Sequence, residues 1–567
     1  MTNIENTAQH GKRLIQGSNL FVFILIFGAV IYPPALFLLQ RKEKAAFQYF
    51  AADTFYYLSV ARHSVQASFY TFDGVFPTNG FHPLWQYSLT LIFDSMKITN
   101  QEIQILVTFY LSILFVAIGT ALFGVALLKV TQNIAISLIA AVPGIYYLIF
   151  SLIEPQYANP WAFVNGMESP FSILLFGILS YSLIELKLLS ELSKFKIALV
   201  SFLLTLITLS RLDDAFIFIP FLASILIFSI TFKEKFINGL VASVTPTIVI
   251  SSYLLYNLSY AGILLPISGF AKGEVSLVVN LVMLIASFVP GGQFGDVWIY
   301  TWGLTTWRIL QLCIPMFLAF IWVWHSIIQQ KKSRGFLQGH NEETIVFGLC
   351  IYVILKGVYN LSNVGLLNQG HWYFPLSIMT FNMISAIIIA RITKLNTIPR
   401  KISQHLVTLS FLFVLLIANA FTNTKRVTEY NVQYFEFWKQ RQNITAKLNM
   451  LSGRSGIIEF DDGIISYSLD RATMSGLGFM LDREAYEAKQ RGELLPLAYS
   501  RGFSLIASMY YLSFITTEMN SDPNLLRKNL AGTSFLYLEN LEKWNFSVIY
   551  RDPDTKTVFI HFEPIAP

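Results

Sequence analysis

The sequence predicts an α-helical polytopic membrane protein with about 11 transmembrane helices and a C-terminal extracytoplasmic α/β domain. Hydrophobic residues make up 54% of its 567 residues, and only 13% are charged, about half the charged fraction of soluble domains. Several apolar runs reach roughly 20 residues, enough to cross a hydrocarbon core about 30 Å thick as helices. After Phe421 the composition changes, because charges are dispersed and no further run is long enough to cross.

The expected spans are apolar runs with few or no charged residues. They cover residues 20–39, 103–128, 134–153, 170–186, 197–210, 215–232, 236–258, 309–328, 344–365, 373–390 and 404–421. The first run is too long for a signal-peptide core and no small-residue cleavage site follows it, so we expect it to be retained. The run 277–289 is too short to span comfortably and is interpreted as interfacial or re-entrant.

The distribution of charge predicts the orientation. With the amino terminus in the cytoplasm, the inside loops contain Lys12, Arg13, Lys129, Lys187, Lys194, Lys196, Lys233, Lys235, Lys331, Lys332, Arg334, Arg391, Lys394, Arg400 and Lys401. The outside segments contain Asp53, Asp73, Asp94, Glu154, Glu168, Asp213, Asp214, Glu274 and Asp296. Cytoplasmic loops are typically enriched in lysine and arginine, so this orientation is favoured.

Two domains follow from this arrangement. Residues 1–421 are expected to form the transmembrane domain, with an extracytoplasmic loop at 41–102 that carries the catalytic candidate, and residues 422–567 a soluble extracytoplasmic domain. In that tail, "SGRSGIIEFDDGIISYSLD" and the alternating "KTVFIHFEP" predict short strands. In the loop, Ala46 to Gln66 has helical spacing but is too short to cross, so it is expected to lie on the membrane surface.

Several kinds of chemistry are disfavoured. Both cysteines, Cys313 and Cys350, fall in apolar runs, which leaves no disulfide framework and no C-x-x-C metal or redox motif. The net charge of +6 comes from loop residues rather than a basic stripe with interleaved aromatics, so no nucleic-acid partner is predicted. No G-x-S-x-G elbow or Cys/His pairing indicates a covalent nucleophile.

The loop after the first span concentrates polar and turn-forming residues. Asp53 in "ADTFYYLSVAR" is followed by "FDGVFPTNGFHPLW", which packs two turn signals, two prolines, Asn79 and His82 into fourteen residues. Such a composition predicts a fixed loop. A carboxylate at Asp53 can act as a base, although an Asp at the start of a helix can equally serve as an N-cap.

These motifs resemble the GT-C superfamily of integral-membrane glycosyltransferases, and more closely its bacterial branch of polyprenyl-phosphate-sugar-dependent arabinofuranosyl- and mannosyltransferases. The similarity rests on the first loop and on "NGMESP", "SRLDDAF", "LPISGFAKG" and the tail "DDGIISYSLDRATMSGLGFMLD". It implies inverting transfer, in which Asp53 deprotonates the acceptor hydroxyl while polyprenyl phosphate departs. The branch commonly has an acidic pair in this loop, whereas Ala52 and Thr54 flank Asp53 here, so no metal and no other cofactor is predicted.

Other candidates are assigned by residue type and place. The donor phosphate is assigned to four groups expected near the outside ends of spans, which are Arg211, Lys272, Lys356 and His371. The acceptor or sugar is assigned to Asn79, His82, Glu168, Asp213 and Asp214.

Each assignment has a structural alternative. A lysine inside an apolar run, such as Lys356, is costly unless it is paired or lines a polar cavity, but it can also snorkel to the surface. Arg211 can pair with its neighbouring carboxylates and order a turn, and His371 can belong to an interfacial aromatic belt. Glu168 can be an ordinary helix-start carboxylate.

The expected location is a bacterial cytoplasmic membrane, crossed many times. The expected partners are a polyprenyl-phosphate-linked sugar donor, membrane lipid, and an envelope glycan, glycolipid or protein acceptor. A transporter or flippase of lipid-linked glycans is the alternative class. It is disfavoured because the polar residues gather on one side and no corresponding pair of Gly/Pro-broken spans indicates inverted repeats.

Overall fold

The computed structural model describes most of the chain. The described residues are 17–32, 35, 46–47, 49–141, 164–186, 193–271, 277–280, 341–364, 373, 375–394, 429–452 and 455–565, apart from 462, 470, 510–511, 517–518, 520–521 and 533–539. The chain divides into two compact units, which we name the helical unit and the mixed unit. The helical unit comprises Met1–Gln40, Tyr110–Ser251 and Glu274–Arg426, and the mixed unit Arg41–Phe109, Ser252–Gly273 and Val427–Pro567. The loop 41–102 therefore groups with the C-terminal tail.

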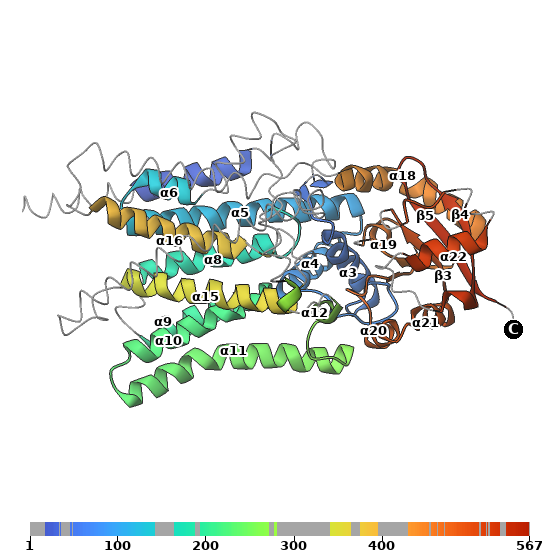
Figure 1. Cartoon of the computed structure of the whole chain (residues 1–567). Helices are drawn as coiled ribbons and strands as arrows, with labels where there is room; N and C mark the ends of the chain where they lie inside the picture. The colour runs from blue at the N-terminus through green and yellow to red at the C-terminus, as the bar shows by residue number, and fades with distance from the viewer. Residues whose placement is uncertain are drawn as a thin grey trace, which may run out of the picture. The chain divides into compact units, whose positions relative to one another are not determined.

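The helical unit is built from long apolar helices, several of which run side by side in Figure 1. They are a helix over Gly17–Tyr32, α5 (Gln101–Thr131), α6 (Ile134–Ala140), α8 (Ser169–Glu185), α9 (Lys194–Ser210), α10 (Phe218–Phe228), α11 (Phe232–Ala261), α15 (Asn341–Asn363) and α16 (Pro375–Lys394). A 3-10 segment, η2 (Leu212–Ile217), joins α9 to α10. The last part of α11 and the first part of α5 belong to the mixed unit.

The expected count of about 11 transmembrane helices is not supported by the described residues. Three helices are long and apolar enough to cross a membrane, namely α5, α11 and Ile345–Asn363 of α15, and three shorter apolar helices cover Gly17–Tyr32, Ser169–Glu185 and Pro375–Ala390. The expected spans 309–328 and 404–421, and most of 134–153, lie outside the described residues.

The expected span at 215–232 shows why runs of apolar residues overestimate the count. Its residues are shared among η2, the eleven-residue α10 and the first residue of α11. Eleven helical residues rise only about 16 Å, roughly half of a hydrocarbon core. The absence of charge therefore located the apolar stretch correctly, but not the helix ends within it.

Two glycines allow α5 and α8 to pack closely. A Cβ on Gly177 would lie 2.1 Å from the carbonyl oxygen of Gly119, and a Cβ on Gly119 would lie 2.5 Å from that of Ile173. Small residues at such crossings let helix backbones approach in a membrane, where packing rather than water exclusion drives association. This contact holds α8 against α5, and the N-cap of α8 carries a charged group described below.

The mixed unit combines the first loop with the C-terminal tail. Its helices are α3 (Thr54–Ala67), α4 (Pro83–Ser95), α12 (Ile267–Ala271), α18 (Glu429–Ser452), α19 (Ile464–Ser468), α20 (Arg483–Gln490), α21 (Leu494–Ser500) and α22 (Pro523–Gly532). A short 3-10 segment, η6 (Leu541–Lys543), precedes the fourth strand of the sheet.

A five-stranded mixed sheet organises the tail. Its order is β2 (Thr473–Ser475), β1 (Gly456–Glu459), β3 (Phe503–Ser508), β5 (Val558–Pro564) and β4 (Trp544–Arg551). Strand β1 pairs in parallel with both β2 and β3, whereas β5 pairs antiparallel with β3 and β4. Strands are expected in "SGRSGIIEFDDGIISYSLD" and "KTVFIHFEP". They are confirmed as β1 and β5, but the expectation for the second half of the first stretch is wrong, because Ile464–Ser468 forms the helix α19. The core lies between this sheet and its helices and includes Ile458, Leu495, Ile506, Leu526 and Ile560.

Candidate functional site

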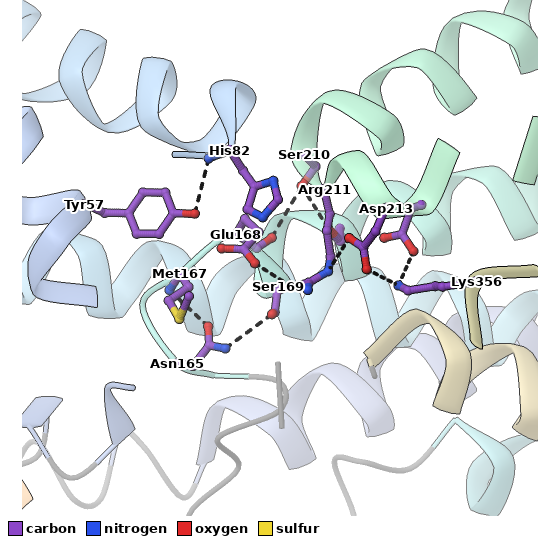
Figure 2. A network of polar contacts seen from close by, with 12 residues as sticks. Tyr57, His82, Asn165, Met167, Glu168, Ser169, Ser210, Arg211, Asp213 and Lys356 are labelled. Carbon is purple, nitrogen blue, oxygen red and sulfur yellow. Dashed lines mark hydrogen bonds and ion pairs between the residues drawn. The ribbon is translucent and has the colours of Figure 1, made fainter. Parts of the chain in front are cut away.

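A cluster of five charged side chains is buried in the helical unit, where α8, α9, η2 and α15 meet. Figure 2 shows four of them joined by ion pairs. Arg211 Nη1 lies 2.7 Å from Glu168 Oε1, and its Nε lies 2.8 Å from Asp213 Oδ1. Lys356 Nζ lies 3.5 Å from Asp213 Oδ2 and also pairs with Asp214. We name these five residues the buried charge cluster.

The segment before α8 places Glu168. Gly166 adopts a φ of 75°, in the left-handed region that glycine enters without strain. Asn165 then closes the turn, because its Oδ1 accepts the Met167 N–H at 3.0 Å and its Nδ2 donates to Ser169 Oγ at 3.3 Å. Glu168 stands at the N-cap of α8 without a side-chain capping bond, which leaves its carboxylate directed to Arg211.

The end of α9 places Arg211. Its extended backbone, with φ −150° and ψ 110°, terminates α9 and begins η2, which carries both aspartates. Immediately before Arg211, the hydroxyl of Ser210 lies 2.8 Å from that of Ser172 and connects α9 to α8. The guanidinium also lies over the ring of Tyr373, 4.2 Å from its centroid, in the range of a cation–π interaction.

Lys356 lies on α15 and is 1% exposed. The alternative in which it snorkels to the surface is therefore wrong, because its ammonium is paired with carboxylates inside the unit. Tyr352, one turn earlier on the same face, donates its hydroxyl to Asp214. Tyr352 and Lys356 stand at i and i+4 in an apolar run, and this spacing is the sequence signal that could have identified Tyr352.

The cluster contains more carboxylates than cations. Two positive side chains face three acidic ones, Glu168, Asp213 and Asp214. Asp214 Oδ2 is buried and has no hydrogen-bond partner among the described residues. Because both cations are already paired, the balance of charge weighs against a phosphate at this point.

Metal binding by these carboxylates is not favoured by their contacts. Each carboxylate in the buried charge cluster already faces a cation. No group of three His, Cys, Asp or Glu residues in the described part of the chain is arranged to hold a metal ion. The absence of a metal cofactor stays a prediction.

An apolar pocket opens in the same unit. It is partly open to its surroundings and lies among α8, α9, α10 and α15. Its lining includes Phe176, Leu204, Ile217, Phe221 and Leu349, with Ser180 and Ser224 as the few polar groups. Ile217 follows the aspartates of η2 by one helical turn, so the pocket adjoins the segment that carries them.

The mixed unit holds Asp53. This residue occupies the N-cap of α3, and its side chain makes no capping hydrogen bond. Asp53 therefore occupies the N-cap position, but its side chain does not make the hydrogen bond that an N-cap residue usually makes. The base role assigned to Asp53 stays a prediction.

The two other loop candidates have structural partners. Asn79 donates to the carbonyls of Ile263 and Leu265 at 3.4 and 3.2 Å and accepts the Ile267 N–H at 3.1 Å. His82 is the N-cap of α4, and its backbone N–H donates to Tyr57 Oη at 3.4 Å. Asn79 thus anchors the loop to the segment before α12. Contact of Asn79 and His82 with a sugar stays a prediction.

The structure brings together Glu168, Arg211, Asp213, Asp214 and Lys356, which the sequence analysis had assigned to different ligands. Lys272 and His371 lie outside the described residues. Sequence reasoning missed Tyr352 and Tyr373. No spacing rule pointed to Tyr373, whose contact with Arg211 depends on tertiary packing.

Comparisons with known proteins give a likeness in fold. No family model and no curated protein matches the chain. The crystal structure of the oligosaccharyltransferase of Archaeoglobus fulgidus in the apo form is similar over 87% of this chain and 70% of that chain, with 12% identity and a TM-score of 0.52. The structure of the archaeal oligosaccharyltransferase AglB of the same organism, in complex with an inhibitory peptide and a dolichol-phosphate, is similar over 86% of this chain and 69% of that chain. The identity is 12% and the TM-score 0.48. The first likeness shows that this chain shares its fold with that oligosaccharyltransferase.

Proposed function

We propose that this protein is an inverting membrane glycosyltransferase that moves a sugar from a polyprenyl-phosphate donor to an envelope glycan, lipid or protein. The observation that carries the proposal is the fold likeness to an oligosaccharyltransferase over 87% of the chain. The resemblance of the sequence motifs supports the bacterial branch that uses polyprenyl-phosphate sugars, and a reaction on the outer face of the cytoplasmic membrane. The transferred sugar is a hexose or a pentose.

In the proposed reaction Asp53 accepts the proton of the acceptor hydroxyl. The acceptor oxygen then bonds to the anomeric carbon, and the bond from that carbon to the phosphate oxygen breaks. Polyprenyl phosphate leaves with the bonding electrons, so the configuration inverts. A phosphate is a good leaving group, which is why one positioned carboxylate and no covalent nucleophile suffices.

The helical unit would hold the lipid-linked donor. Its apolar pocket suits part of a prenyl chain, since an apolar lining with few polar groups favours burial of hydrocarbon. The buried charge cluster would supply fixed dipoles beside the donor.

Sugar transfer in proteoliposomes tests the proposal. The purified chain would be given polyprenyl-phosphate-linked hexose and pentose donors, together with extracts of envelope acceptors, and products would be followed by mass spectrometry. We expect a sugar to appear on an acceptor with release of polyprenyl phosphate. Movement of intact donor between leaflets without any cleavage would instead favour a flippase and contradict the proposal.

A further inference from the structure

Asp461 and residues 463–467 of the tail, together called the 461–467 segment, contact α3 directly within the mixed unit. Three side chains of α3 donate hydrogen bonds to its carbonyl oxygens: Tyr56 to Asp461 at 2.8 Å, Ser59 to Gly463 at 3.2 Å and Arg62 to Tyr467 at 2.9 Å. Residues spaced by three lie on one face of a helix. One face of α3 is therefore bonded to a single stretch of backbone.

Gly463 brings that backbone against the first turn of α3. It has a φ of 89°, and a Cβ added to it would lie 2.6 Å from the Tyr56 nitrogen and 2.8 Å from the Phe55 carbonyl carbon. The same Tyr56 N–H donates to the carbonyl oxygen of Asp53 at 3.2 Å. Glycine is thus required here twice, for its backbone conformation and for the absence of a side chain.

Buried carboxylates hold the 461–467 segment on the sheet. Glu459, at the end of β1, accepts the N–H groups of Ile465 and Ser466 at 2.9 and 2.8 Å. Asp461 accepts the Ser508 hydroxyl at 3.1 Å and the Met509 N–H at 2.7 Å. Charged acceptors on backbone N–H groups make strong bonds, so the segment is rigidly tied to β1 and β3.

The first loop has a second close contact with the tail. A Cβ on Gly80 would lie 1.8 Å from the carbonyl oxygen of Phe479. Beside it, the Thr78 hydroxyl donates to the Leu481 carbonyl at 3.1 Å. The sequence motif "TNGF" and the tail therefore approach each other at backbone distance, as α3 and Gly463 do.

We propose that residues 461–467, with Gly463 at their centre, are a positioning element that sets the place of the Asp53 carboxylate for proton abstraction. The proposal rests on the proposed function, because it assigns this role within that reaction. In this proposal the tail contributes to catalysis by positioning Asp53 and does not itself contact the substrate. Asp461, bonded to the sheet, accepts the Tyr56 hydroxyl, and Gly463 packs its backbone against the same first turn of α3, so a shift there moves the residue that begins the helix.

Two glycine variants isolate the contact. Gly502 has a φ of 86°, close to that of Gly463, but a Cβ there would meet nothing within 4 Å. Gly463→Ala and Gly502→Ala therefore share backbone strain and differ in the clash with α3. We expect Gly463→Ala to lower kcat for sugar transfer by roughly 10- to 100-fold relative to Gly502→Ala, as expected for a misplacement of about 1 Å, with the donor KM unchanged.

A double-variant cycle with Asp53→Asn separates positioning from loss of folded protein. If Gly463 acts through Asp53, Gly463→Ala has no further effect on the residual turnover of Asp53→Asn. A multiplied loss, or equal kcat for the two glycine variants, overturns the proposal. Tyr56→Phe, which deletes only the hydroxyl bonded to Asp461, should lower kcat in the same direction and serves if Gly463→Ala fails to fold.

Hydrogen exchange distinguishes this proposal from failure of the proposed function. In the full chain in detergent, the amides of residues 54–58 should exchange faster in Gly463→Ala than in Gly502→Ala, whether or not transfer is detected. Equal exchange in both variants overturns positioning of α3 by Gly463. Absence of transfer, with faster exchange in Gly463→Ala, counts against the proposed function alone, whereas full turnover by Asp53→Asn removes Asp53 as the base and overturns both.

Discussion

Arg211 and Glu168 form an ion pair between the end of α9 and the start of α8, with Nη1 and Oε1 2.7 Å apart and both side chains almost fully buried. Breaking a buried pair by removing one partner leaves an uncompensated charge, which is far more costly than the pair is stabilising. The buried charge cluster is therefore a point at which single substitutions have large and interpretable effects.

Removing one cation of the cluster should destabilise the helical unit strongly. We expect Lys356→Met to lower the free energy of unfolding by about 3–5 kcal/mol, because Asp214 then stays buried without its cation. Adding Asp214→Asn should restore a large part of the loss. Denaturant titration in mixed detergent micelles measures the effect. Lys129→Met, which breaks a partly exposed pair with Glu185, should cost less than about 1 kcal/mol, and equal losses in the two variants would contradict the prediction.

Asp53→Asn should abolish most sugar transfer while leaving the protein folded. The amide keeps the shape of the side chain and caps helices about as well as the acid, but it cannot accept the acceptor proton. Turnover should fall by roughly 10²- to 10⁴-fold, as is typical for loss of a general base. Transfer would be assayed at matched protein levels, with donor binding measured separately. Near-normal turnover would remove Asp53 from the mechanism.

Gly177→Ala should force α5 and α8 apart. The added methyl group would meet the Gly119 carbonyl, and overpacking of this kind costs about 1–3 kcal/mol. Gly239→Ala on α11 is the matched control, because nothing lies within 4 Å of a Cβ there. It should be neutral or stabilising by up to about 1 kcal/mol, the difference in helix propensity. Thermal unfolding in detergent compares the two, and a stabilised Gly177→Ala would refute the close packing.

Lys489 should make stability depend on pH in the alkaline range. Burial lowers the pKa of this lysine from 10.5 to about 8, although its ammonium donates to the carbonyls of Gly476 and Leu477. Between about pH 8 and 10.5 the unfolded chain therefore binds more protons than the folded chain, and the free energy of unfolding rises with pH. Lys489→Met should lose this rise, whereas replacing the exposed Lys543 should retain it. Denaturation of the full chain from pH 7 to 10 would show whether the rise is present.

The proposed orientation can be tested by thiol labelling. In a chain whose two native cysteines are replaced by alanine, Gln490→Cys should react with an impermeant reagent in intact cells, because the lysine and arginine distribution assigns the tail to the outside. Lys233→Cys, expected in an inside loop, should react only after lysis. Both residues are exposed within their units. The reverse pattern would invert the orientation.

Local patterns predicted much of the fold. Alternation in "KTVFIHFEP" identified β5, and uncharged runs located α5, α11 and α15. They did not predict that Arg41–Phe109 would group with the tail, since that depends on contacts between residues some 400 positions apart, such as Tyr56 with Asp461. Similarly, the lysine in the apolar run of α15 signalled a polar partner, but only packing shows that the partner is the aspartate pair of η2.

The carboxyl edge of the parallel strands is where open α/β sheets usually bind ligands. Here Asp461 follows β1, Ser508 ends β3, and the Asp461 carbonyl accepts the hydroxyl of Tyr56 on α3. That edge is thus occupied by the protein's own helix. A ligand that bound the tail at this edge would have to displace α3. Binding of such a ligand and packing of the first loop against the tail would therefore exclude each other.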